Sequence, residues 1–147
     1  MYKLQAFGVL VLTLLAFSQA SPVPSKKTFL QAVKKDVESL KNMNEVLKVG
    51  ITFLVPTDVQ DSCTVNALDC FSYILDGLQR KCKNGTVANT ISNAMKNLDA
   101  FMGMDSKERK EKRLCYEGCK YSMKQRNTNQ ALEDFIRLLQ QMYQADQ

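Results

Sequence analysis

The chain of 147 residues contains no histidine. Histidine is the side chain that most often acts as a general base at neutral pH, so a catalytic site would have to use carboxylates or lysines alone. The sequence also lacks a glycine-rich phosphate-binding loop and an isolated pair of carboxylates suited to acid–base chemistry. We therefore predict that the protein is not an enzyme and uses no cofactor.

Long hydrophobic runs are also scarce, because the sequence has a single one, from Phe7 to Phe17. This run follows Lys3 and precedes the small residues Ser18 and Ala20, which is the pattern of a secretory signal peptide. It is shorter than the roughly 20 residues that cross a bilayer. We expect a signal peptide over residues 1–20, no membrane insertion, and a secreted, extracellular domain over residues 21–147.

Cysteine is well represented after the signal peptide, at Cys63, Cys70, Cys82, Cys115 and Cys119. Outside the cell such thiols oxidise, so disulfides are the first expectation. A zinc site is disfavoured because the first pair has a C-x6-C spacing and no histidine is present. The formal net charge of +5 is modest and selects no polyanionic partner, and we expect no nucleic acid and no metal.

Four segments have apolar residues at intervals of three and four, which predicts amphipathic helices around one core. They cover about 26–48, 62–81, 86–102 and 128–145. Ser25 and Ser62 are expected to cap the first two helices, and the fourth is expected to start around Asn127 or Thr128. Between the first two helices, residues 51–56 (ITFLVP) are predicted to form an extended linker against the core.

The lengths of the connections predict the topology. About 13 residues join the first and second helices, about 25 the third and fourth, and only about 5 the second and third. Thirteen extended residues reach ~43 Å, whereas a helix of ~18 residues is ~27 Å long, so each long link can start the next helix parallel to the previous one. We predict an all-α, up-up-down-down four-helix bundle.

The cysteine spacing restricts the disulfides. Cys63 and Cys70 lie two helical turns apart, about 10 Å along the axis, which exceeds the disulfide limit near 7 Å. They are therefore expected to bond to Cys115 and Cys119 in the last crossover, in either order. Cys82 is left without a partner in this scheme, which predicts a free thiol or an intermolecular bridge, a buried free cysteine being the commoner outcome.

Three stretches resemble the short-chain cytokines of the interleukin-2, interleukin-15 and interleukin-21 group. They are DVQDSCTVNALDCF (58–71), RLCYEGCKYS (113–122) and ALEDFIRLLQQMY (131–143). VESLKN in the first helix and LLQQM in the last favour the interleukin-21 branch as the nearest, and CTVNALDCF favours the interleukin-15 branch next. The resemblance implies a monomeric cytokine that signals through JAK and STAT proteins in lymphocytes.

The resemblance also implies bridges and contacts. It implies the bridges Cys63–Cys115 and Cys70–Cys119, although Cys115 and Cys119 are spaced C-x3-C where the group usually has C-x2-C. It implies receptor assembly from a common gamma chain and a private subunit. The implied receptor-binding residues are Gln140 and Tyr143 for the common gamma chain, and Asp36 or Glu38 for the other subunit.

Two polar motifs remain. Residues 106–113 (SKERKEKR) alternate in charge and are expected to form a solvated loop, with heparan-type glycans as a further possible partner. Asn84 begins a sequon for N-glycosylation. The alternative function is a basic, saposin-like, membrane-active defence protein, but that class usually has six cysteines that tie its terminal helices together.

Overall fold

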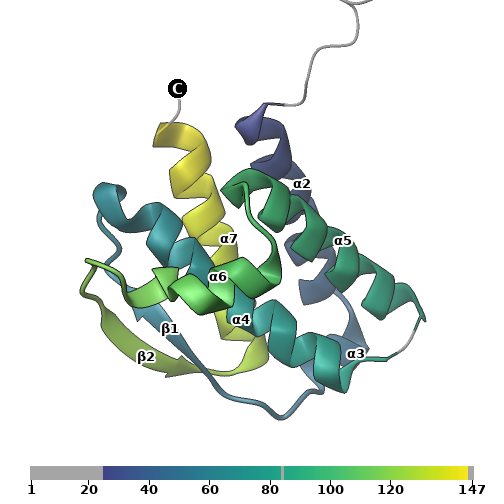
Figure 1. The fold of residues 1–147 in the computed structure, drawn as a ribbon. Coiled ribbons are helices and arrows are strands. Elements are labelled where there is room, and N and C mark those ends of the chain that lie inside the picture. The colour runs from purple at the N-terminus through teal and green to yellow at the C-terminus, as the bar shows by residue number, and fades with distance from the viewer. Residues whose placement is uncertain (1–24, 84, 146–147) are drawn as a thin grey trace, which may run out of the picture.

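The computed structural model describes residues 25–83 and 85–145, so the predicted signal peptide and the sequon asparagine Asn84 lie outside the described residues. In chain order the elements are α2 (Lys26–Lys41), α3 (Asn44–Leu47), β1 (Phe53–Thr57), η1 (Asp61–Cys63), α4 (Thr64–Lys81), α5 (Gly85–Met102), α6 (Ser106–Lys112), η2 (Leu114–Tyr116), β2 (Ser122–Arg126) and α7 (Thr128–Ala145). Figure 1 shows the long helices packed together, with α6 alongside α4 and the two strands at one edge.

The helix ends follow local capping chemistry. The Ser25 side chain accepts a hydrogen bond from the Thr28 N–H, as expected for the cap of α2. At the start of α7 the Asn127 side chain accepts from the Gln130 N–H at 2.8 Å, and the Gln130 side chain accepts from the Asn127 N–H at 3.2 Å. This reciprocal pair is a capping box, which satisfies backbone donors that the helix itself leaves open.

Two boundary predictions were wrong. The first helix ends at Lys41 because the backbone N–H of Asn42 turns back to the carbonyls of Ser39 and Leu40, and the short α3 follows. Ser62 does not cap the second helix, because it lies inside the 3₁₀ turn η1 that leads into α4.

Contacts between the helices define their directions. Lys27 near the start of α2 lies over the Tyr143 ring near the end of α7, and Lys41 at the other end of α2 pairs with Glu133. α2 and α7 are therefore antiparallel. The contact of Lys26 with Phe101 makes α2 and α5 antiparallel as well.

α4 and α7 are antiparallel as well. Gln141 near the end of α7 donates to Asp61 just before α4, so these helices are also antiparallel. The short link makes α4 and α5 antiparallel neighbours. α2 therefore runs parallel to α4, and α5 runs parallel to α7. This arrangement confirms the predicted up-up-down-down bundle.

The core is formed by the apolar stripes of the four long helices. Phe71 of α4 and Phe135 of α7 meet with ring centroids 5.4 Å apart, and both are buried. Val46 of α3 is buried too, so the short helix continues the packing of α2 beyond the break. Burial of these side chains stabilises the bundle by roughly 1.5–3 kcal/mol each.

The predicted linker forms one strand of a ribbon. β1 pairs antiparallel with β2, from Phe53 opposite Arg126 to Thr57 opposite Ser122. Phe53 and Val55 are buried, which confirms that the linker lies on the core. The Phe53 ring would lie 3.0 Å from a Cβ at position 77, so glycine at this point of α4 lets the ribbon approach the helix closely.

Candidate functional site

Two disulfides fasten the last crossover to α4. The bonds join Cys63 to Cys119 and Cys70 to Cys115, with Cα atoms 6.0 and 4.7 Å apart. Cys63 at the N-cap of α4 and Cys70 within α4 both pair with the crossover, as the geometry predicted. The pairing order implied by the resemblance, Cys63–Cys115 and Cys70–Cys119, was wrong for this chain.

The order follows from the direction of the crossover. α6 docks at the middle of α4, where Arg109 contacts Asp69. The chain that leaves α6 therefore reaches Cys70 first, through Cys115, and then runs back along α4 toward its N-terminal end. Cys119 consequently meets Cys63, which is the N-cap residue of α4.

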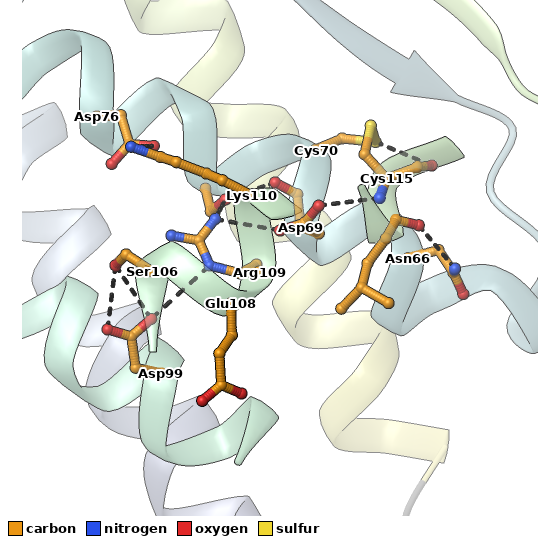
Figure 2. A network of polar contacts seen from close by, with 12 residues as sticks. Asn66, Asp69, Cys70, Asp76, Asp99, Ser106, Glu108, Arg109, Lys110 and Cys115 are labelled. Carbon is orange, nitrogen blue, oxygen red and sulfur yellow. Dashed lines mark hydrogen bonds and ion pairs between the residues drawn. A yellow bond between two sulfur atoms is a disulfide. The ribbon is translucent and has the colours of Figure 1, made fainter. Parts of the chain in front are cut away.

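A buried ionic network lies beside these bonds (Figure 2). Arg109 and Asp69 are both 0 % exposed, and Arg109 Nη1 donates to Asp69 Oδ1 at 3.1 Å. The same nitrogen donates to the Ser72 hydroxyl, and Arg109 Nε lies 3.7 Å from Asp99 Oδ1 of α5. The guanidinium thus links α6 to two helices of the bundle.

The network changes the ionisation of its α5 carboxyl. Burial raises the pKa of Asp99, and the Arg109 guanidinium and the Ser106 hydroxyl oppose that rise. The Ser106 hydroxyl lies 3.2 Å from Asp99 Oδ2. Asp99 therefore supplies a carboxyl group to the network, and its partial burial disfavours the ionised form of that group.

The expectation of a solvated loop over residues 106–113 was wrong. Residues 106–112 form α6, whose N-terminus is capped by the Asp105 side chain, and Arg109 on its inner side is fully buried. Lys110 lies 3.5 Å from Asp76 of α4. Of the five basic side chains of the run, Arg109 is buried and Lys110 is paired with Asp76 at the surface, which weakens the basis for a polyanion site.

Sequence reasoning missed the polar residues of α4 that receive α6. Asp69, Ser72 and Asp76 are buried although they interrupt an apolar stripe. Their spacing of three and four residues places them on one face of the helix, and this periodicity was the available signal. It indicates a second, polar stripe that needs a charged partner from elsewhere in the chain.

The predicted residues of α2 lie on its outer surface. Asp36 is half-buried and accepts a hydrogen bond from Asn93 of α5 at 2.7 Å. Glu38 is exposed and pairs with Lys34 one turn earlier, at 3.1 Å. Asp36 therefore lies at the α2–α5 seam, whereas Glu38 faces solvent.

The predicted residues of α7 differ in accessibility. Gln140 is exposed and lines a polar depression of about 450 Å³ together with Asp61 and Gln144. The Tyr143 hydroxyl accepts from Gln31 of α2 at 3.0 Å, so this half-buried side chain ties the two helices together. Gln140 is the more available of the two residues for a partner.

Cys82 follows α4 and is the free cysteine of the described chain, as predicted. It is buried, and burial together with the neighbouring Glu45 carboxylate raises the pKa of its thiol. The thiol is therefore protonated and weakly reactive at neutral pH.

Across 25–83 and 85–145, no group of three or more cysteine, aspartate or glutamate side chains is placed to hold a metal ion. In the same part of the chain, no helix combines the length and apolar character that a membrane crossing requires.

Comparisons with known proteins identify relatives. The family model described as Interleukin 15 matches residues 9–144. Interleukin-15 of Marmota monax is 22 % identical over 120 residues, which cover 80 % of this chain and 70 % of the relative. Interleukin-15 of Felis catus is 25 % identical with the same coverage, and that of Mus musculus is 23 % identical over 110 residues, or 74 % of this chain and 64 % of the relative. No solved structure matches the chain significantly.

Proposed function

The chain belongs to the interleukin-15 family of cytokines, and from this we propose that it is secreted and joins two receptor subunits at the surface of lymphocytes. The subunits are the common gamma chain and a private receptor chain, and their approach activates JAK and STAT proteins. The observation that supports the proposal is the bundle itself, in which Gln140 is exposed on α7 and Asp36 lies at the α2–α5 seam.

Gln140 is proposed as a contact of the common gamma chain. Its exposure and its place beside a polar depression support this role, because a partner side chain can enter the depression and bond to the amide. Tyr143 is proposed to contribute at the edge of the same contact. Its bond to Gln31 makes part of its role structural.

The private subunit is proposed to contact α2 through Asp36 or Glu38. The two acids imply different contacts. A receptor that binds Asp36 would contact the seam between α2 and α5, where Asn93 lies, whereas a receptor that binds Glu38 would contact α2 alone. Five expectations remain predictions: the interleukin-21 branch as nearest relative, the monomeric state, cleavage after Ala20, glycosylation of Asn84 and binding of heparan-type glycans.

The proposal is tested by STAT phosphorylation in lymphocytes treated with the secreted protein. Gln140→Ala should reduce the response at least tenfold, because central interface residues carry much of the binding energy. Gln125→Ala, which removes another exposed amide, from β2, is the matched control and should leave the response unchanged.

Asp36→Ala and Glu38→Ala identify the α2 contact by the same assay. The acid that meets the receptor should lower the response, while both variants keep the helical circular-dichroism spectrum. No STAT response to the wild-type protein at nanomolar concentration, together with leakage of lipid vesicles at micromolar concentration, would instead favour a membrane-active protein.

A further inference from the structure

A polar cleft of about 300 Å³ lies between the strand ribbon and α7. Its charged lining consists of Lys124 and Arg126 from β2, Asp134 and Arg137 from α7, and Asp58 directly after β1. Three basic side chains against two carboxylates give the cleft a net charge of +1. The charge of the cleft therefore favours a ligand that carries a single negative charge.

The two arginines of the cleft are held by one carboxylate. Asp134, whose side chain is 14 % exposed, lies 3.0 Å from Arg126 Nε through Oδ2 and 3.1 Å from Arg137 Nη1 through Oδ1. Each guanidinium uses one nitrogen in this contact, and its other nitrogens form no further hydrogen bond among the described residues. Those N–H groups remain available to an incoming carboxylate, which arginine binds through parallel hydrogen bonds.

Hydrogen bonds also fix the walls of the cleft. Gln141 of α7 donates to the carbonyl of Val59 at 3.2 Å and to the carboxylate of Asp61 at 2.8 Å. The Thr57 hydroxyl at the end of β1 donates to the carbonyl of Ser122 in β2 at 2.8 Å. The segment after β1 is thus tied to α7, and the two strands are tied to each other. A ligand would meet a preformed site, which lowers the entropy lost on binding.

The cleft adjoins the depression that contains Gln140. Arg137 and Gln141 line both hollows, and the Arg137 side chain is 71 % exposed. A partner protein buries about 800 Å² on each side of a typical interface, so one that covers Gln140 also reaches Arg137. A sulfated glycan fits the cleft less well, because its many anionic groups would approach the exposed Asp58 carboxylate as well as the arginines.

We propose that the cleft receives an acidic side chain of the receptor subunit that binds Gln140, with Arg126 and Arg137 as its contacts. This inference rests on the proposed receptor-binding function. The receptor carboxylate accepts hydrogen bonds from both guanidiniums, and the exposed Lys124 at the cleft adds attraction during approach. Charges of this kind chiefly raise the association rate and the specificity of a complex.

The test is surface plasmon resonance of the full secreted protein over immobilised common gamma chain ectodomain. Arg137→Gln should raise Kd about tenfold, mainly through slower association, because it removes a charge at the edge of the contact. The loss should shrink as salt is raised from about 0.05 M to about 0.5 M, since salt screens exposed charges. Arg126→Gln should act in the same direction. Arg137→Gln carries the test if Arg126→Gln disturbs folding, because Arg137 is the more exposed side chain.

Two control variants separate the cleft from general effects of charge and of the ribbon. Arg113→Gln removes the same charge from an exposed position on the crossover and should bind with the wild-type Kd. Gln125→Ala should also bind like the wild type, because Gln125 lies between Lys124 and Arg126 on the opposite face of β2.

The outcomes distinguish this inference from the proposed function. Binding of the wild-type protein with an unchanged Kd in Arg137→Gln and in Arg126→Gln would overturn the inference alone. An equal loss in Arg113→Gln would also overturn it, because net charge would then explain the effect. Weaker retention of Arg137→Gln on heparin, with unchanged receptor binding, would assign the cleft to a sulfated glycan instead. Failure of the wild-type protein to bind would overturn the proposed function, and this inference with it.

Discussion

Removal of the buried guanidinium is the sharpest perturbation of this fold. Arg109→Met keeps an apolar stem of similar length but leaves the Asp69 carboxylate, which is 0 % exposed, without its ion-pair partner at 3.1 Å. It also removes the contacts to Ser72 and Asp99. Breaking a buried pair from one side costs about 3–5 kcal/mol, against about 5–15 kcal/mol for the total stability of a domain. We therefore expect the loss of a large share of the unfolding free energy.

The assay is urea unfolding followed by circular dichroism at pH 7, with the disulfides intact. Lys110→Met is the matched control on the same helix, because its side chain is 53 % exposed and its pair with Asp76 is screened by solvent. The control should lose less than about 1 kcal/mol. Asp69→Asn/Arg109→Met should be less destabilised than Arg109→Met alone, because no buried charge is left without a partner.

The reasoning is refuted if Arg109→Met loses no more stability than Lys110→Met. That outcome would mean that α6 contributes its basic side chains to solvent, as the sequence alone suggested. An additive double variant would show that the two side chains do not act as a pair.

Three further predictions concern thiols and pH. Iodoacetamide at pH 7 should modify Cys82 far more slowly in the folded protein than in denaturant, because burial raises the pKa of its thiol; equal rates would contradict this. Low concentrations of reductant should open the half-exposed Cys63–Cys119 bridge before the buried one, as mass spectrometry of alkylated samples would reveal; simultaneous opening would count against it. The pKa of Asp99 is raised above its ordinary value of 3.8, so the folded state binds this proton more tightly than the unfolded state does. As the pH rises from 3.8 to the raised pKa, this carboxyl therefore lowers the free energy of unfolding. Asp99→Asn should lack this decrease in urea unfolding, and a wild-type minus variant difference that is constant with pH would refute the assignment.

The long helices were predictable because their signals are local. The stripes over 62–81, 86–102 and 128–145 lie within about two residues of α4, α5 and α7, because apolar periodicity and turn residues act within a few positions of the chain. The first helix was predicted too long because Leu47 continues the apolar spacing beyond the break at Asn42, although its side chain is exposed in the structure.

The remaining features depend on residues that are distant in sequence. β2 was not predicted because its partner β1 lies more than 60 residues earlier, and its own pattern is polar and exposed. Arg109 is buried only because α4 offers Asp69 and Ser72 to it. The order of the disulfides depends on the direction in which the crossover meets α4, which the cysteine spacing does not encode.

The central claim is that one molecule joins two different receptor chains through separate faces. The most direct measurement captures the secreted protein on immobilised common gamma chain ectodomain and then passes other cytokine-receptor ectodomains over it. We expect the wild-type protein to be captured, Gln140→Ala to be captured poorly, and one private subunit to bind the captured protein as a third component. Failure of the wild-type protein to bind the common gamma chain, or competition between the two subunits for one face, would contradict the account.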